Sequence, residues 1–222
     1  MTLKHVIFDC DGVLVDSEPL SMRADVMLLK QHGIEISEAE AHNRFVGTTF
    51  QAMLDMMTEQ FGTAFPPGLH AVKNTMVEAL YRSELKIVPG VVDVLDHLKA
   101  HGVTISIGSN SPKKRVELAV ELVGIADRFD RIVSYEDVAN GKPAPDIFLQ
   151  ASQLAGAALD ECLVVEDSLT GVTAAVAAGI RTIGFTGTHG HPSQHAKDLR
   201  QVGAAVVIAR MGELVTHLGP CP

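Results

Sequence analysis

Short apolar runs rich in Val and Ile alternate with longer helical patterns along most of this chain. Such runs are typical of strands buried on both faces, as in parallel sheets. Because parallel neighbours need a crossover connection, the alternation predicts an α/β fold with a doubly wound, Rossmann-like parallel sheet. The predicted strands are 5–8, 103–107, 131–134, 162–165, 181–184 and 205–208. The predicted helices among them are 90–101, 113–123, 145–155, 171–178 and 193–202.

One region interrupts this alternation. Between residues 17 and 86 the sequence shows only helical patterns, at 20–32, 48–61 and 69–85. An insertion of this length is not a normal connection between a strand and the next crossover. We therefore predict two parts, a catalytic core formed by residues 1–16 and 87–222 and an all-helical cap subdomain formed by residues 17–86.

Polar side chains follow several predicted strands at the point where each strand ends. In a doubly wound sheet, ligands bind beyond the carboxyl ends of the strands, so these side chains are expected to converge. The combination of carboxylates, hydroxyl, amide and ammonium predicts a phosphoryl-transfer site. Its members are Asp9, Asp11, Ser109, Asn110, Lys142, Glu166 and Asp167.

Asp9 and Asp11 flank a single residue at the end of the first strand, before Gly12. Alternation along a strand points both carboxylates the same way, and their repulsion favours a cation or a proton between them. Asp9 is the predicted nucleophile, which forms an aspartyl-phosphate and divides one difficult step into two. Asp11 is the predicted general acid and base, which protonates the leaving oxygen and later deprotonates water.

The remaining residues supply charge and hydrogen bonds. Asp9, Glu166 and Asp167 offer the hard oxygen ligands that Mg²⁺ prefers, so Mg²⁺ is the expected cofactor. Glu166 is expected to bind the metal directly or through water, or to orient another metal ligand without contacting the metal. The Ser109 hydroxyl and the Asn110 backbone N–H are placed to hold phosphate oxygens, and Lys142 contributes a positive charge matched to the transferring group.

This ordered set of motifs resembles that of the haloacid dehalogenase superfamily of phosphotransferases. The resemblance covers the whole chain and implies a Rossmann-like core with an α-helical cap inserted after the first strand. It also implies that the Asp11 backbone carbonyl is a further metal ligand. The matching motifs are Asp9-Cys-Asp-Gly-Val, Ser109-Asn110, Lys142 in Gly-Lys-Pro-Ala-Pro-Asp, and Glu166-Asp167-Ser168 with Gly171.

Within this superfamily, the run from Asp9 to Glu18 is similar to the subgroup of β-phosphoglucomutase-like enzymes and small sugar-phosphate phosphatases. Dehalogenases typically carry Tyr at the position of Asp11, so phosphate chemistry is favoured. The mutases carry an anchoring Arg and a His where this chain has Phe50 and Ser21. We therefore expect a phosphatase for a small sugar or polyol phosphate, with a phosphosugar mutase as the alternative. A catalytically silent phosphate-binding protein is an alternative of another class.

The cap is expected to select the substrate. Glu18 is a candidate to face it, Gly47 and Thr48 are candidates to offer backbone N–H groups at a helix start, and Phe50 is a candidate to contact its less charged part. Asp16 or Ser17 is expected to cap the first helix. The basic residues at 113–115 are interpreted as a solvated helix start, and the histidines at 189, 191 and 195 as a loop followed by a helix.

Composition limits the partners. The net charge of −9 argues against nucleic acid, because no basic stripe is present to neutralise its phosphates. A small phosphorylated metabolite remains compatible, since a local cation reverses the field inside one pocket. Cys10, Cys162 and Cys221 show neither metal-ligand spacing nor a disulfide framework, so a cytoplasmic location is expected. The first apolar run is too short for a membrane span, so no membrane partner is expected. The expected oligomeric state is a monomer or a weak homodimer.

Overall fold

The computed structural model describes residues 2–45 and 48–220. The chain divides into two compact units, residues 1–16 with 86–222 and residues 17–85. The first unit holds a parallel sheet of six strands in the order β3-β2-β1-β4-β5-β6, which confirms the predicted doubly wound α/β fold. The strands are β1 (His5–Phe8), β2 (Thr104–Ser109), β3 (Arg131–Ser134), β4 (Cys162–Glu166), β5 (Arg181–Phe185) and β6 (Val206–Ile208).

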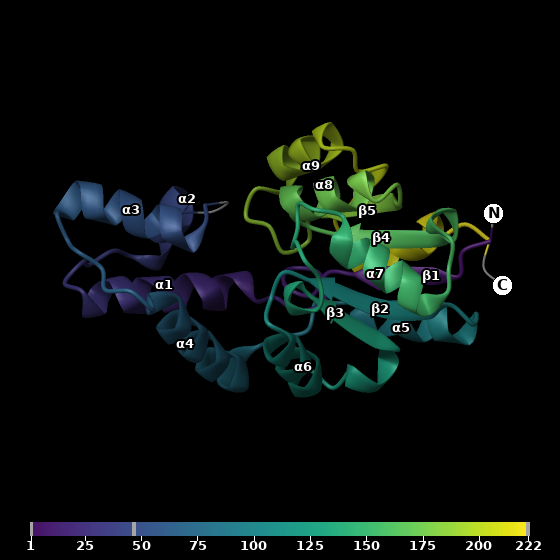
Figure 1. The fold of residues 1–222 in the computed structure, drawn as a ribbon, viewed down its shortest axis with the longest axis horizontal. Coiled ribbons are helices and arrows are strands. Elements are labelled where there is room, and N and C mark those ends of the chain that lie inside the picture. Colours follow the sequence, from purple (N-terminus) through teal and green to yellow (C-terminus); the bar gives the residue numbers. More distant parts are fainter. Residues whose placement is uncertain (1, 46–47, 221–222) are drawn as a thin grey trace. The chain divides into compact units, whose positions relative to one another are not determined.

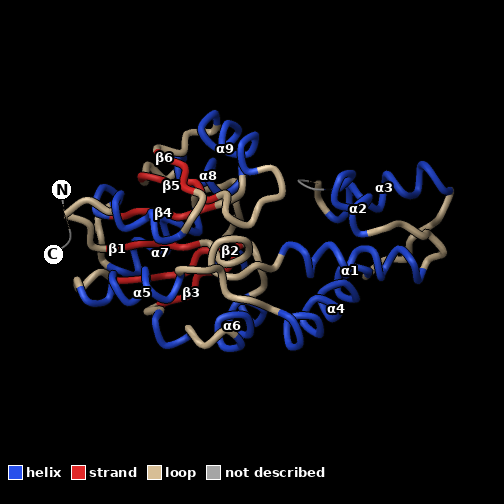
Figure 2. Tube along the Cα trace, turned by 180° about the vertical axis from the view of Figure 1, so that it is seen from behind, coloured by secondary structure: helices blue, strands red, loops and turns tan. Residues whose placement is uncertain are grey.

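Helices lie on both faces of the sheet, as Figures 1 and 2 show. Two of them, α7 and α8, share one apolar cluster with Ile7 of β1 and Val164 of β4. These central strands are buried along their whole length, which accounts for their uninterrupted apolar sequence. The helices of this unit are α5 (Val91–Ala100), α6 (Lys113–Leu122), α7 (Asp146–Ala155), α8 (Leu169–Ala177) and α9 (Pro192–Gln201).

The second unit is helical and has its own apolar core, which includes Leu28 of α1 and Met53 and Met57 of α3. Its helices are α1 (Glu18–Gln31), α2 (Glu38–Phe45), α3 (Phe50–Phe61) and α4 (Leu69–Glu84). Helix α2 was not predicted. Lys86 groups with the first unit, where its carbonyl accepts a hydrogen bond from the Asp16 backbone N–H at 2.9 Å, whereas the predicted cap extends to residue 86.

The start of α1 decides between the two predicted caps. Ser17, not Asp16, occupies the N-cap position, and its side chain makes no capping hydrogen bond. Glu18 begins the helix and places a negative charge in the first turn, where the helix dipole favours it.

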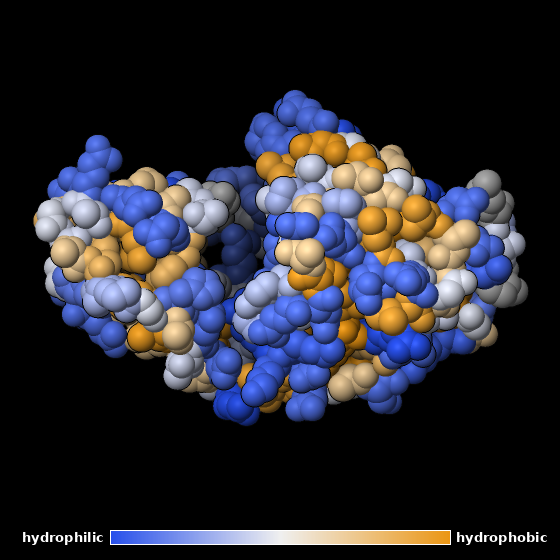
Figure 3. Space-filling view, viewed as in Figure 1, coloured by the Kyte–Doolittle hydropathy of each residue, from blue (hydrophilic) through white to orange (hydrophobic). Residues whose placement is uncertain are grey.

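Polar and apolar residues are interspersed over the molecular face seen in Figure 3. Across residues 2–45 and 48–220, the structure contains no helix that is both long and apolar enough to cross a membrane. Near the two ends of the chain, the Leu3 N–H donates a hydrogen bond to the Pro220 carbonyl at 2.8 Å.

Candidate active site

Asp9 lies directly after β1, and its backbone N–H donates to the Val165 carbonyl of β4 at 2.9 Å. Its carboxylate meets the Lys142 ammonium, with Nζ 2.5 Å from Asp9 Oδ1. The same Nζ lies 2.8 Å from Oε1 of Glu166, the last residue of β4. These three side chains are buried, so one ammonium joins two carboxylates out of contact with bulk water.

The Lys142 loop is fastened to the end of β2 by the side chain of Asn110. Asn110 Nδ2 donates to the Lys142 carbonyl at 3.0 Å, and the Lys142 backbone N–H donates to Asn110 Oδ1 at 2.8 Å. The Phe148 ring of α7 lies 5.0 Å from Lys142 Nζ and adds a cation–π contact. Asn110 therefore positions Lys142, a contribution in addition to the backbone N–H predicted from sequence.

Glu166 is held by the start of α8. Its Oε2 accepts hydrogen bonds from the Ser168 backbone N–H at 2.5 Å and from the Ser168 hydroxyl at 3.0 Å. Ser168 also caps α8, because its hydroxyl accepts from the Gly171 N–H at 3.0 Å. A Cβ at position 171 would overlap the Glu166 carboxylate, so the close approach of helix and carboxylate requires glycine there.

The residues present fit a divalent cation. One carboxylate oxygen from each of Asp9, Glu166 and Asp167 lies within 4.8 Å of the others. Gly12, which follows in the turn after β1, has a positive φ of 81° that suits glycine. A Cβ on Gly12 would also collide with the Asp167 carboxylate, so the turn leaves room for these oxygens to converge. Three hard oxygen donors at one point suit Mg²⁺.

Burial and charge act in opposite directions on this cluster. Burial raises the pKa of Asp9 to about 7, against the lowering effect of the Lys142 ammonium, and the Glu166 and Asp11 carboxylates add to the rise. Burial alone would lower the pKa of Lys142, but its two carboxylate partners hold it above its usual range. Lys142 therefore remains an ammonium, and the clustered carboxylates have a physical need for further positive charge.

Asp11 is half-buried and contacts the loop after β2. Its Oδ2 accepts a hydrogen bond from the Ser111 hydroxyl at 2.5 Å, and Arg115 Nη2 donates to Ser111 Oγ at 2.6 Å. The interpretation of residues 113–115 as a solvated helix start is therefore wrong for Arg115, although Lys114 is exposed as expected. Ser109, the last residue of β2, is buried, and its Oγ accepts from the Ser111 N–H at 3.0 Å.

The candidate substrate residues of the cap belong to the helical unit. Gly47 lies outside the described residues. The Thr48 N–H and hydroxyl both donate to the Phe45 carbonyl, and Thr49 caps α3, which begins at Phe50 and not at Thr48. The Thr48 N–H is therefore already used within its own turn.

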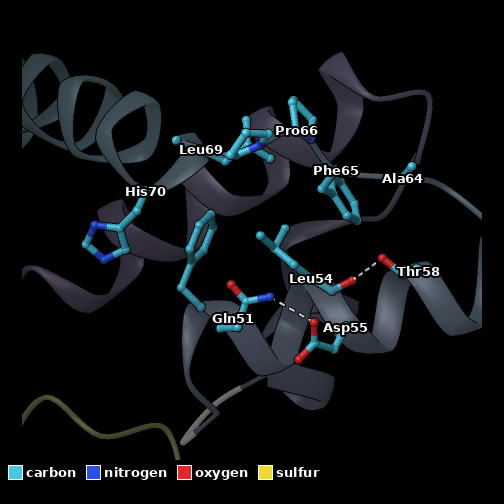
Figure 4. A pocket seen from close by; sticks show the side chains of 12 residues that line it. Gln51, Leu54, Asp55, Thr58, Ala64, Phe65, Pro66, Leu69 and His70 are labelled. Atoms are coloured by element: carbon cyan, nitrogen blue, oxygen red, sulfur yellow. Dashed lines mark hydrogen bonds between the residues drawn. The ribbon is translucent and has the colours of Figure 1, made fainter.

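Phe50 packs within the cap against cationic and aromatic neighbours. Its ring lies 5.6 Å from the His70 ring and 4.9 Å from Lys73 Nζ. Lys73 in turn pairs with buried Asp25 of α1 at 2.7 Å. Phe50 also lines a pocket of about 470 Å³ between α3 and the segment 64–70 (Figure 4). Gln51, Asp55 and Thr58 give this pocket a partly polar wall, and all of its lining residues belong to the helical unit.

Comparison with known proteins decides the family. A family model described as haloacid dehalogenase-like hydrolase matches residues 6–185. The chain belongs to this family. The match begins in β1, just before Asp9, and ends with β5, so it includes the strand ends that carry Asp9, Ser109 and Glu166.

Several known proteins resemble the chain over most of its length. The 6-phosphogluconate phosphatase of Escherichia coli is 28% identical, with 88% of each chain covered. The Protein SUPPRESSOR OF QUENCHING 1 of Arabidopsis thaliana is 35% identical over 80% of this chain, which spans only 17% of that protein. A HAD family hydrolase from Deinococcus radiodurans, solved with bound phosphate and sodium, is 32% identical with a TM-score of 0.81, covering 97% of this chain and 95% of its own.

This haloacid dehalogenase-like chain also contains site contacts that the sequence did not predict. His195 of α9 hydrogen-bonds through Nε2 to the Asp167 carbonyl at 2.5 Å, and its ring stacks on His189 at 3.8 Å. The Thr188 hydroxyl donates to the Gly12 carbonyl at 2.7 Å. The segment after β5 therefore supports both loops that carry the carboxylates. The histidines do lie in a loop and the helix that follows, as expected, but His195 also supports the Asp167 loop, and His189 stacks on it.

Proposed function

We propose that this phosphoric monoester hydrolase is a Mg²⁺-dependent phosphatase that hydrolyses a small sugar or polyol phosphate through an aspartyl-phosphate on Asp9. The observation that carries the proposal is the buried Lys142 ammonium, bound to both Asp9 and Glu166. A carboxylate held beside a fixed cation can approach an anionic phosphate without full charge repulsion. The meeting of three carboxylates and one ammonium at the strand ends supports phosphoryl transfer, because it places a nucleophile, a cation and metal ligands together.

In the first step, an Asp9 oxygen attacks phosphorus and forms a P–O bond, while the bond from phosphorus to the substrate oxygen breaks. Asp11 gives its proton to the departing oxygen, so the product leaves as a neutral alcohol. Ser109 and the Asn110 N–H hold the phosphoryl oxygens, and Lys142 balances the charge that develops on them.

In the second step, water attacks the phosphorus of the aspartyl-phosphate. Asp11, now ionised, takes the proton from water, and the bond between phosphorus and Asp9 breaks to release phosphate. Asp9, Glu166, Asp167 and the Asp11 carbonyl are the residues that would hold Mg²⁺. When bound, Mg²⁺ supplies positive charge that lets the carboxylates and the phosphate coexist.

Two observations support a sugar or polyol phosphate as the substrate. The E. coli relative that covers most of the chain is a 6-phosphogluconate phosphatase. Phe50 offers a ring face, flanked by Lys73 and His70, where the mutase subgroup carries an anchoring Arg. We propose that the helical unit selects the organic part of the ester, with Glu18, Gly47 and Phe50 as contacts. The Thr48 N–H is not among them, because it already donates to the Phe45 carbonyl.

A panel of phosphorylated sugars, polyols and nucleotides tests the proposal by release of inorganic phosphate, with Mg²⁺ and with EDTA. We expect release that depends on Mg²⁺ and is strongest with sugar or polyol esters. Acid-quenched enzyme should contain a phosphorylated peptide that includes Asp9, and the Asp9→Asn variant should lack it. Isomerisation of a hexose phosphate without net phosphate release would contradict the proposal and favour a mutase.

A further inference from the structure

A chain of hydrogen bonds runs within the core unit from Arg115 through Ser111 to Asp11. The Ser111 hydroxyl lies 2.5 Å from Asp11 Oδ2, and Arg115 Nη2 lies 2.6 Å from the same hydroxyl oxygen. Ser111 is only 5% exposed, and the two charged partners are half-buried. Hydrogen bonds in such surroundings are less weakened by water than bonds on an open surface.

The direction of this chain is fixed by the chemistry of its members. A guanidinium can only donate hydrogen bonds, so Ser111 Oγ must accept from Arg115. The Ser111 hydroxyl donates its proton to Asp11 Oδ2, and an ionised carboxylate can only accept it. With Oδ2 engaged as an acceptor, rotation of the Asp11 carboxyl group is restricted, and an acid proton is directed to the other oxygen, Oδ1.

We propose that Ser111 and Arg115 are positioning residues, which hold the Asp11 carboxyl group in the orientation that proton transfer to the substrate needs. This inference rests on the phosphatase function proposed above. The proton on Asp11 Oδ1 passes to the leaving oxygen as the P–O bond breaks, and the same oxygen takes a proton from water in the second step. Loss of the hydroxyl leaves Asp11 chemically intact but removes the hydrogen bond that orients its Oδ2.

Two substrates with different leaving groups test this role. The first is an alkyl phosphate that the wild-type enzyme hydrolyses, whose leaving oxygen needs a proton. The second is para-nitrophenyl phosphate, whose leaving group departs as a stable anion. Because kcat/KM reports the steps up to release of the alcohol, we expect Ser111→Ala to lower kcat/KM by about 10-fold to 100-fold for the alkyl ester and by less than about 3-fold for the aryl ester.

Three further variants separate positioning from folding. Ser111→Thr keeps the hydroxyl and should restore alkyl kcat/KM to within about 3-fold of wild type. Arg115→Met removes the donor behind Ser111 and should show the same selective loss, to a smaller extent. Lys114→Met removes an exposed cation from the same turn of α6 and should leave kcat/KM unchanged for both substrates. Thermal unfolding of each variant shows whether it is folded.

Equal losses on the two substrates, or no loss on either, would overturn the inference. If Ser111→Ala does not fold, Arg115→Met decides the question by the same criterion. Wild-type enzyme that releases phosphate from neither ester would refute the proposed phosphatase function itself. If this inference alone fails, the wild type is still active and the variants lose activity equally on both esters. The two failures are therefore distinguishable.

Discussion

The two ends of the central strands both carry buried polar side chains, but of opposite character. At the carboxyl ends, Asp9, Lys142 and Glu166 form an ionic cluster. At the amino ends, His5 of β1 and Cys162 of β4 are paired in register, and His5 Nε2 shares a 2.8 Å hydrogen bond with Ser106 Oγ of β2. Cys162 Sγ lies 3.7 Å from His5 Nδ1. This second cluster is neutral, because burial lowers the pKa of His5 to about 4.

This difference in charge suggests that the amino-end cluster serves stability and the carboxyl-end cluster serves chemistry within one sheet. A neutral hydrogen-bonded group is inexpensive to bury, whereas clustered carboxylates are costly unless a cation accompanies them. Among the described residues of the core unit, the buried charges of Asp9, Lys142 and Glu166 lie where the parallel strands open toward a ligand. The amino-end cluster should therefore influence stability without activity, and the carboxyl-end cluster should influence activity above all.

The largest effect is expected for Asp9→Asn. Loss of the nucleophile should lower turnover by roughly 10⁴-fold or more. The metal-free protein should unfold at the same temperature or a higher one, because burial disfavours the Asp9 charge and Lys142 keeps Glu166 as a partner. Phosphate release and thermal unfolding in EDTA measure the two quantities. Substantial residual turnover would refute the assignment of Asp9 as nucleophile.

Lys142→Met should damage both properties. Removal of the ammonium leaves two buried carboxylates without their shared cation, and breaking a buried ion pair in this way costs about 3–5 kcal/mol of unfolding free energy. Turnover should fall by roughly 10²-fold to 10³-fold, because the charge on the transferring group loses a stabilising cation. Denaturant unfolding and steady-state kinetics measure these losses. A variant as stable as Asp9→Asn would show that the charge balance described for this cluster is wrong.

The sequence predicted the sheet well because its strands have one simple pattern. Strands buried on both faces require continuous apolar runs, and the observed bounds of β1 and β3 equal those predicted. Helix α2 was missed because only Ala41 and Phe45 of its eight residues are buried, so its apolar stripe is a single pair and is too short to recognise in the sequence. A short helix of this kind is stabilised by its neighbours in the folded unit and not by its own sequence.

The convergence of the candidate site residues was predictable because strand ends in a parallel sheet meet at one edge. The contacts that orient them were not, since they join distant parts of the chain. Asn110 and Lys142 are 32 positions apart, and His195 and Asp167 are 28 apart. A signal did exist for Arg115, which follows Ser111 by four positions at a helix start, a spacing that brings side chains together.

His5 provides a pH test of the neutral cluster. Its pKa is lowered from 6.5 to about 4 in the folded state, mainly by burial and against the raising effect of Asp130. Between these values the unfolded chain binds a proton that the folded chain does not, so stability should fall as pH decreases from about 6.5 to about 4. The predicted loss is roughly 3 kcal/mol. Unfolding by urea at a series of pH values measures it.

The matched control is the double variant His5→Leu with Ser106→Ala. It removes both members of the hydrogen-bonded pair, so that neither leaves a buried polar atom unsatisfied. This double variant should show a shallower dependence of stability on pH in the same window, with unchanged kcat at pH 7. An equally steep dependence would assign the acid sensitivity to other groups. A large fall in kcat would contradict the separation of the two ends of the sheet.

The smallest effect is expected for Ser168→Ala, which connects stability and chemistry at the carboxyl ends. The variant loses the cap of α8 and one of the hydrogen bonds to Glu166, at a cost of about 1–2 kcal/mol in unfolding free energy. Ser37→Ala removes a comparable bond, from the Glu40 N–H to the Ser37 hydroxyl, at the start of α2 in the helical unit. If Ser168 holds Glu166 in place, only Ser168→Ala should lower kcat, by a few-fold, and should weaken Mg²⁺ binding measured by calorimetry. Equal kinetic behaviour of the two variants would limit Ser168 to capping, and Glu166 would then be oriented by Lys142 and the Ser168 backbone N–H without help from the hydroxyl.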